Sequence, residues 1–201
     1  MSQRWSVLGV IPARLNSTRL PRKVLREICG RPMVQHVYER ARQCPRLTEL
    51  VVATDSLEVA EVCRRLGIPV EMTSPDHPSG TDRIAEVAAR PEYAAYDIVV
   101  NVQGDEPFVS GDAVAGAADQ VRSSRFPLGT AAAPAGPEIL GNPDVVKVVC
   151  DDDGRALYFS RAAVPYLREP ADAAELHGLV RQHIGVYAYT RAALRDWVSR
   201  P

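Results

Sequence analysis

The chain has 201 residues, of which 46% are apolar and 24% charged, and its formal net charge at pH 7 is −1. The length fits one domain, or one domain with a small appendage, and the composition is that of a globular protein. The near-zero charge excludes a generally basic surface for nucleic acid or acidic membranes, so any affinity for anions must be local.

The N-terminus and the cysteines indicate a reduced, cytoplasmic protein. Residues 1–5 have no signal-peptide pattern, and no apolar run approaches the roughly 20 residues of a membrane span. The cysteines lack Cys-x-x-Cys spacing, so neither a zinc site nor a disulfide scaffold is predicted. Three of the four, which are Cys29, Cys44, Cys63 and Cys150, have apolar surroundings and are expected in the core.

A buried strand and a cationic loop open the chain. The apolar run from Trp5 to Ile11 predicts a strand buried on both faces. The loop after it lies at the edge where ligands bind in open α/β sheets, and its fixed positive charge and backbone N–H groups suit a polyphosphate. The alternative is a solvated basic loop, because surface charges often have no specific partner. The basic residues of the loop are Arg14, Arg19, Arg22 and Lys23.

Strands and helices alternate through the next part of the chain. Apolar residues at helical spacing predict one helix that begins at Pro32 and another that follows Asp55, where Glu58 completes a capping-box pattern. Short crossovers between apolar strands predict a parallel sheet. The predicted segments are an extended piece at 24–28, a helix ending before Pro45, a strand at 50–54, a helix ending at Gly67 and a strand at 68–72.

A polar loop at 73–80 leads into the second half, where residues 97–102 form the clearest central strand. Asp151–Asp153 with Gly154 predict a plain turn, because a calcium loop would need a bidentate Glu that is absent. The other predicted segments are a helix near 84–88, a helix at 111–121, strands at 128–134, 145–150, 156–159 and 182–189, an irregular stretch at 165–178 and a helix at 190–198. This order predicts an α/β fold with a doubly wound, mostly parallel sheet.

A second polar cluster, residues 103–107, follows the central strand, so Asp105 is expected at the same edge as the cationic loop. A carboxylate beside cations suits a nucleotide with magnesium, which takes one or two protein ligands and the rest from phosphates and water. The alternative is that Asp105 and Glu106 cap the next helix or fill a turn. Residues 73–83 either contact a base or form an ordinary surface loop.

Common cofactor and nucleophile motifs are absent. No Gly-x-Gly-x-x-Gly follows the first strand, and the chain has no Gly-x-x-x-x-Gly-Lys-Ser/Thr and no Gly-x-Ser-x-Gly. Dinucleotide binding by the usual fingerprint, phosphate binding by a P-loop and a hydrolase-type serine elbow are therefore all disfavoured.

Sequence blocks cover nearly the whole chain and together form a specific pattern. They are Ile11-Pro12-Ala13-Arg14-x-x-Ser17-Thr18-Arg19-Leu20-Pro21-x-Lys23, Ala53-Thr54-Asp55, residues 77–83, residues 101–107, Asn142-Pro143-x-x-Val146-Lys147-Val148-Val149, residues 158–162 and residues 183–189. In this order they resemble the blocks of the 3-deoxy-manno-octulosonate cytidylyltransferases, also called CMP-Kdo synthetases.

The resemblance implies a cytoplasmic enzyme that transfers CMP from CTP to a sugar acid, Kdo or Kdo-like, and releases pyrophosphate. Lys23, Arg14 and Asp105 match catalytic positions, with Asp105 as a ligand of Mg²⁺. Further positions that match the nucleotide site are Pro12, Ala13, Arg19, Ser79, Gly80, Thr81 and Gln103. Positions that match the acceptor site are Arg83, Gln103, Arg161, His183 and Tyr187.

The resemblance also implies the architecture. We expect one nucleotidyltransferase domain over residues 1–201, with a three-layer, Rossmann-like sheet and a small β-hairpin appendage around 142–180 that joins a homodimer. The family continues beyond the point matched by Pro201 with a Gly-Ile-Asp-Thr-Pro motif whose Asp helps to hold the metal, and no residue here matches it. Two alternatives stay open: the same CMP transfer to another small acid such as a phosphonate, or, because the metal motif is unmatched, a homologue that binds CTP without catalysis.

Overall fold

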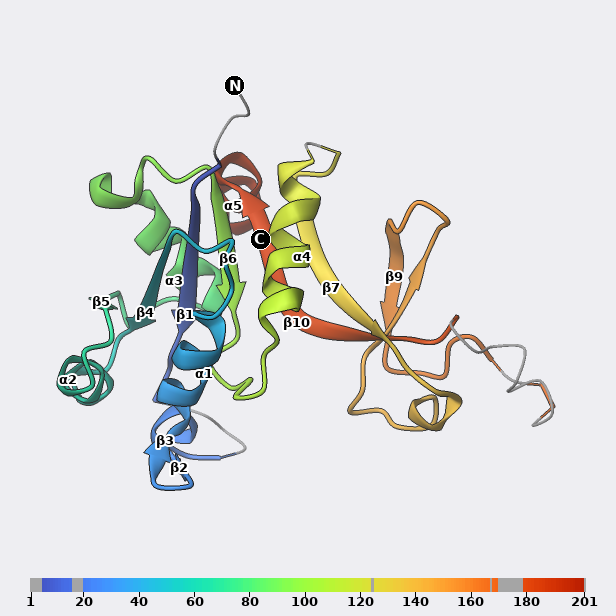
Figure 1. Ribbon diagram of the computed structural model, residues 1–201, viewed down its shortest axis with the longest axis horizontal. Coiled ribbons are helices and arrows are strands. Elements are labelled where there is room, and N and C mark those ends of the chain that lie inside the picture. Colours follow the sequence, from blue (N-terminus) through green and yellow to red (C-terminus); the bar gives the residue numbers. More distant parts are fainter. Residues whose placement is uncertain (1–4, 16–19, 124, 167, 170–178, 201) are drawn as a thin grey trace. The chain divides into compact units, whose positions relative to one another are not determined.

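The computed structural model describes residues 5–15, 20–123, 125–166, 168–169 and 179–200. The chain forms two compact units, one of residues 1–130 and 185–201 and a smaller one of residues 131–184. Two strands, β7 (Leu128–Pro134) and β10 (Arg181–Thr190), pass from one unit into the other (Figure 1). Within the described ranges, no helix is long and apolar enough to cross a membrane.

The sheet of the larger unit has the order β5-β4-β1-β6-β10, and β7 pairs with β10. Four of its strands pair in parallel, and β10 runs antiparallel to β6. The central strands are almost completely buried, as expected where helices cover both faces of a sheet. The predicted mostly parallel, doubly wound sheet is therefore confirmed. The parallel strands are β1 (Val7–Pro12), β4 (Glu49–Thr54), β5 (Val70–Met72) and β6 (Ile98–Val102).

Helices cover both faces of this sheet (Figure 1). On one face lie α3 (Gly80–Ala89) and α5 (Arg191–Val198). Alternate strand residues face the other way, toward α1 (Met33–Ala41) and α4 (Gly111–Arg122), while α2 (Leu57–Arg65) packs beside β4 and β5. The core on the α3 and α5 face consists of Leu8, Val10, Val51, Ala53, Ile84, Val87, Ala88, Val99, Tyr189 and Leu194.

The predicted cap of α2 is wrong by one residue. Ser56, and not Asp55, is the N-cap, because its hydroxyl accepts a hydrogen bond from the Val59 N–H. The Asp55 carboxylate instead forms an ion pair with Arg83 of α3. Both residues are common helix caps, so the choice between them depends on a tertiary contact that the local pattern does not contain.

The extended piece predicted at 24–28 is also only partly correct. The segment contains a short 3₁₀ helix, η1 (Lys23–Leu25), and the strand β2 (Glu27–Ile28), which pairs with β3 (Arg31–Pro32). Cys29 and Gly30 form the turn between these strands, with φ of 50° and 76°. Cys29 is exposed in this turn, while two of the other cysteines are buried and one is half-buried. The prediction of three cysteines in the core is therefore wrong by one.

The smaller unit contains the antiparallel hairpin of β8 (Lys147–Cys150) and β9 (Ala156–Ser160). Between them the Asp151 carboxylate accepts hydrogen bonds from two backbone N–H groups, and Gly154 has a φ of 78°, so the aspartates form the predicted turn. The first part of β10 pairs with β8. The insertion predicted at 142–180 lies inside this unit, and its role in dimerisation stays a prediction.

Gly104 gives a direct test of how β6 and β1 fix the edge of the sheet. A Cβ at this position would lie 2.4 Å from the Pro12 carbonyl oxygen, so the backbone must move if glycine is replaced. We expect Gly104→Ala to lower the free energy of unfolding by about 1–3 kcal/mol, the usual cost of overpacking. Chemical denaturation measures this change.

Gly116 within α4 is the matched control, because a Cβ there meets no atom within 4 Å. Gly116→Ala should instead raise the free energy of unfolding by about 0.5–1 kcal/mol, since glycine weakens a helix interior. Equal effects of the two substitutions would contradict the close approach of Gly104 to β1.

Candidate active site

The carboxyl ends of the parallel strands bring together most of the residues predicted for the nucleotide. β1 ends at Pro12, β4 at Thr54 and β6 at Val102, and the polar segments follow directly after these residues. Parallel strands all end at one edge, which is the usual ligand-binding edge of open α/β sheets.

Lys23 and Asp105 meet at this edge although they are 82 residues apart, with 2.7 Å between Lys23 Nζ and Asp105 Oδ2. Their side chains are 32% and 46% exposed, so a ligand can reach both. The buried Val24 fixes η1, and thereby the Lys23 main chain, on the protein. The structure thus places the predicted phosphate-binding cation beside the predicted metal ligand.

Arg14 is held at the same edge by the loop that precedes α3. Its Nη2 donates to the His77 carbonyl oxygen at 3.0 Å and its Nη1 to that of Pro78 at 3.4 Å. Pro12 packs beneath Gly80, where a Cβ would lie 3.4 Å from Pro12 Cγ. The first strand and the start of α3 are therefore in direct contact, as the predicted nucleotide site requires.

Ser79 and Thr81, which are predicted to contact the nucleotide, also form hydrogen bonds within the protein at the N-terminus of α3. The Ser79 hydroxyl accepts hydrogen bonds from the N–H groups of Thr81 and Asp82, so Ser79 is the N-cap. Thr81 forms a hydrogen bond with the Tyr189 hydroxyl, while burial raises the pKa of Tyr189 to about 12. Tyr189 is thus held as a neutral phenol beneath the start of this helix.

A charged network supports the loop that carries Arg14. The Glu86 carboxylate accepts the Ser74 N–H at 2.9 Å and contacts the His77 imidazole at 2.5 Å and Arg90 Nη2 at 3.0 Å. Burial pushes the pKa of Glu86 upward, but these three hydrogen bonds outweigh it and the net shift is downward. Glu86 therefore stays ionised and fixes the carbonyl groups that hold Arg14.

Gln103 and Glu106 form the turn after β6. The Gln103 carbonyl accepts the Glu106 N–H at 3.2 Å, and the Gln103 side chain lies beside Gly185 of β10. Burial and the charge of Asp105 raise the pKa of Glu106, and Lys23 opposes them. Ser110 is the N-cap of α4, so Asp105 and Glu106 do not cap that helix. The other alternative, that they fill a turn, agrees with the bond from the Glu106 N–H to the Gln103 carbonyl.

Arg83, which the sequence assigned to the acceptor, is buried and paired inside the protein. Its side chain is 1% exposed, its Nη2 lies 3.1 Å from Asp55 Oδ2 and its Nη1 donates to the Thr73 hydroxyl. Buried charges are tolerated when they are paired and hydrogen-bonded, and this pair ties α3 to the ends of β4 and β5. Contact with the acceptor stays a prediction that this burial does not favour.

The Arg83–Asp55 pair should make a large contribution to stability. Arg83→Met leaves Asp55 without its partner, so we expect the free energy of unfolding to fall by about 3 kcal/mol, as when one member of a buried pair is removed. Urea denaturation measures the loss.

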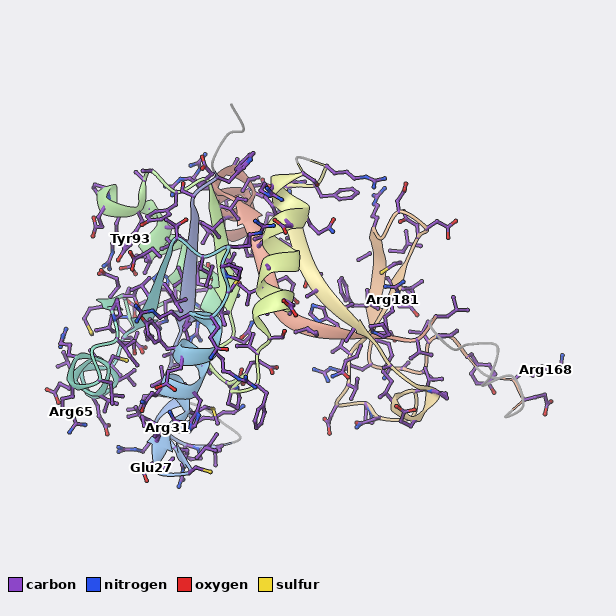
Figure 2. The ribbon with its side chains drawn as sticks, in the orientation of Figure 1. Glu27, Arg31, Arg65, Tyr93, Arg168 and Arg181 are labelled. Atoms are coloured by element: carbon purple, nitrogen blue, oxygen red, sulfur yellow. The ribbon has the colours of Figure 1, made fainter. Side chains whose placement is uncertain are left out.

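The control is Arg31→Met, which breaks an ion pair with Glu39 whose side chains are 49% and 43% exposed. Arg31 lies at the surface (Figure 2), and such pairs contribute at most about 1 kcal/mol. A loss no larger for Arg83→Met than for Arg31→Met would contradict the account of the buried pair.

Three buried polar atoms near the strand ends have no hydrogen-bond partner within the described part of the chain: Arg14 Nε, Arg83 Nε and Asn101 Oδ1. Native proteins rarely leave such atoms unsatisfied, so a ligand or an ordered water is expected there. The sequence interpretation missed Asn101, although a polar residue inside the apolar run 97–102 was the available signal.

The predicted acceptor residues are divided between the two units. Tyr187 belongs to the larger unit, opposite Asn101 in the register of β10 and β6, and stacks on Tyr189. His183 and Arg161 belong to the smaller unit, where burial lowers the pKa of His183. Arg19 lies outside the described residues.

The carboxylate of Asp105 fits a metal ion that takes its other ligands from a bound substrate and water. Among the described residues, no group of three or more His, Cys, Asp or Glu side chains is gathered to hold an ion. Asp105 supplies one accessible carboxylate, and Mg²⁺ commonly binds through one or two carboxylates with substrate phosphates and water.

Comparison with known proteins assigns the family. A family model described as cytidylyltransferase matches residues 8–199. The 3-deoxy-manno-octulosonate cytidylyltransferase of Gemmatimonas aurantiaca is 62% identical over 195 residues, which are 97% of this chain and 76% of that protein. The chain belongs to the 3-deoxy-manno-octulosonate cytidylyltransferase family. It is therefore a nucleotidyltransferase by family, and the sequence prediction is confirmed.

Other members support the assignment. The cytidylyltransferase of the same name from Koribacter versatilis is 47% identical over 96% of this chain and 71% of its own length. A solved CMP:2-keto-3-deoxy-manno-octonic acid synthetase in complex with CTP is 38% identical, with a TM-score of 0.86 over 98% of this chain and 78% of that one. A Leptospira borgpetersenii cytidylyltransferase, 17% identical with a TM-score of 0.59, is similar in fold.

Proposed function

We propose that the protein transfers CMP from CTP to Kdo, with Mg²⁺, and releases pyrophosphate. The observation that carries the proposal is the Lys23–Asp105 contact of 2.7 Å at the carboxyl edge of the sheet. It occurs in a chain that is 62% identical to a 3-deoxy-manno-octulosonate cytidylyltransferase and similar in structure to a synthetase solved with CTP. We expect the reaction to take place in the cytoplasm.

In the proposed reaction, an acceptor hydroxyl oxygen forms a bond to the α-phosphorus of CTP while the bond from this phosphorus to the bridging oxygen breaks. Pyrophosphate leaves with the electron pair, and the hydroxyl proton passes to water. Lys23 and Arg14 bind the phosphates and offset the charge that develops on the leaving group. Arg19, in the same loop of the sequence, is assigned the same role and adds a further positive charge. Mg²⁺ bound to Asp105 would supply further neutralisation of the phosphate oxygens.

The Lys23–Asp105 pair can open for this ligand at little cost. Both side chains are about one-third to one-half exposed, and pairs of this kind contribute at most about 1 kcal/mol. A triphosphate offers Lys23 several charged oxygens, and the metal offers Asp105 a stronger partner. The pair therefore holds both residues in place without blocking the nucleotide.

The remaining predicted residues select the base and the acceptor in this proposal. Those assigned to the cytidine side are Pro12, Ala13, Ser79, Gly80, Thr81 and Gln103. Those assigned to the acceptor are Arg83, Gln103, Arg161, His183 and Tyr187. The Arg161 guanidinium matches the carboxylate of a sugar acid, whereas the burial of Arg83 against Asp55 does not favour such a contact.

We also propose a homodimer joined through the smaller unit. Several large apolar side chains there are exposed, and such residues in a group mark interaction surfaces. They are Leu157, Tyr158, Phe159, Tyr166 and Leu179. Sedimentation of the protein should give twice the chain mass, and Tyr158→Asp should shift the protein toward the monomer.

The experiment is a pyrophosphate-release assay with CTP, Mg²⁺ and Kdo. We expect release that requires all three components. Release with a small phosphonate in place of Kdo, and none with Kdo, would assign the other acceptor class. Calorimetric binding of CTP without release for any acceptor would contradict catalysis and support a homologue that only binds the nucleotide.

A further inference from the structure

Lys147 is a fully buried cation in the smaller unit. Its Nζ donates hydrogen bonds to the carbonyl oxygens of Asn142 at 2.9 Å, Val145 at 2.9 Å and Arg161 at 2.7 Å. An ammonium group has three N–H donors, so each of them is used. In the described part of the chain no carboxylate forms an ion pair with it.

These bonds connect two segments that are distant in the sequence. Asn142 and Val145 are the ends of a tight turn, in which the Val145 N–H also donates to the Asn142 carbonyl and the Asp144 N–H to Asn142 Oδ1. Arg161 directly follows β9. The Lys147 ammonium therefore joins the turn 142–145 to the main chain at Arg161.

The Arg161 side chain binds the same turn. Its Nη1 donates to the carbonyl oxygens of Pro143 at 2.9 Å and Asp144 at 3.3 Å. Four successive carbonyls of the turn thus accept from two cations, the outer pair from Lys147 and the inner pair from Arg161. Because Lys147 also holds the Arg161 carbonyl, it fixes both the main chain of Arg161 and the turn against which the guanidinium lies.

A purely structural role would not need a charge at this position. Placing an ammonium in the protein interior costs free energy, and an apolar side chain of similar volume often stabilises a fold equally well. What the ammonium provides is three directed bonds to main-chain oxygens around one arginine. That pattern is expected where the position of the arginine matters.

We propose that Lys147 is a positioning residue for the acceptor. By holding the turn 142–145 and the main chain of Arg161, it orients the Arg161 guanidinium to bind the carboxylate of the acidic substrate. The hydrogen bonds from Arg161 to this turn come from Nη1, and its Nε and Nη2 carry the donors with which a guanidinium binds a carboxylate. The inference rests on the proposed function, since it takes the acceptor to be a sugar acid.

The test compares steady-state kinetics of the full chain and its Lys147→Met variant, with Kdo and CTP varied separately. Methionine keeps most of the side-chain length and loses every donor. We expect the KM for Kdo to rise by about tenfold to a hundredfold, which is the usual cost when a binding group is displaced by about 1 Å. The KM for CTP should change by less than about twofold, because Lys147 is not placed at the nucleotide.

Two controls separate positioning from loss of stability. Val148→Ala removes buried methyl groups from the next position of the same strand, and it should leave the KM for Kdo unchanged even if it destabilises the unit. Lys147→Gln keeps part of the donor set, so it should give an intermediate KM and serve if the methionine variant does not fold.

Coupling to Arg161 is the sharper readout. If Lys147 acts through Arg161, the double variant Lys147→Met with Arg161→Ala should bind Kdo no more weakly than Arg161→Ala alone. Additive effects, or an unchanged KM for Kdo in both Lys147 variants of an active enzyme, would overturn the inference. Absence of turnover in the unmodified protein would instead overturn the proposed function, and with it the acceptor role given to Lys147.

Discussion

Lys23→Ala is expected to lower kcat/KM for CTP by about a hundredfold to a thousandfold, which is the usual cost of removing one preorganised donor to a developing charge. The ammonium lies 2.7 Å from Asp105 in the free protein. In the proposed complex it would move to the phosphates, where it would stabilise the leaving pyrophosphate more than the ground state. The loss should therefore appear in kcat as well as in KM. Steady-state pyrophosphate release measures both constants.

Arg122→Ala is the matched control for Lys23→Ala, because it removes another cation of the same unit whose side chain is 45% exposed. Arg122 lines a pocket with Val7 and Ile98, the first residues of β1 and β6, so it lies at the opposite edge from the strand ends that build the site. Its loss should change kcat/KM by less than about twofold, since scattered surface charges act weakly at ordinary salt. A similar loss in both variants would show that Lys23 acts only through the net charge of the protein.

Asp105→Asn is expected to give the second large effect, a fall in kcat of about a hundredfold or more together with a higher Mg²⁺ requirement. The amide has the shape of the carboxylate but lacks its charge, and hard cations prefer charged oxygen ligands. Titration of the rate against Mg²⁺ at fixed CTP separates metal affinity from turnover. An unchanged Mg²⁺ dependence would contradict the metal-ligand role.

The Asp105 variant should remain folded, which makes the kinetic result interpretable. Its side chain is 46% exposed, so loss of the Lys23 pair should cost at most about 1 kcal/mol of unfolding free energy. Asp112→Asn, in the first turn of α4, is the control for loss of one exposed carboxylate. It should shift stability by about 0.3–1 kcal/mol through the helix dipole and leave the Mg²⁺ dependence unchanged.

Much of the larger unit could be predicted from the sequence because its strands are apolar runs with polar ends. The predicted strand at 50–54 differs from β4 by one residue, and so does the one at 97–102 from β6. Runs of this kind can be buried only inside a sheet covered on both faces. The meeting of the cationic loop and Asp105 at one edge followed from the same parallel topology.

The remaining features depend on contacts that no local pattern encodes. Asp55 has the spacing of a cap, yet its carboxylate pairs with Arg83 because the fold brings α3 over the end of β4. Lys147 is one of two lysines in the sequence and lies in a matched block, but its three carbonyl partners come from segments that meet through tertiary packing. Arg161 and His183 were matched by resemblance alone, since isolated residues carry no positional signal in their spacing.

The central claim is that CMP is transferred to the sugar acid at the site of Lys23 and Asp105. The most direct measurement is phosphorus NMR of the protein with CTP, Mg²⁺ and Kdo. We predict that the triphosphate signals decline while pyrophosphate and one new phosphodiester signal grow in equal amounts, and that Asp105→Asn suppresses both products. Pyrophosphate accompanied by free CMP, with no phosphodiester to the acid, would contradict the account, because the nucleotide would then be hydrolysed and not transferred.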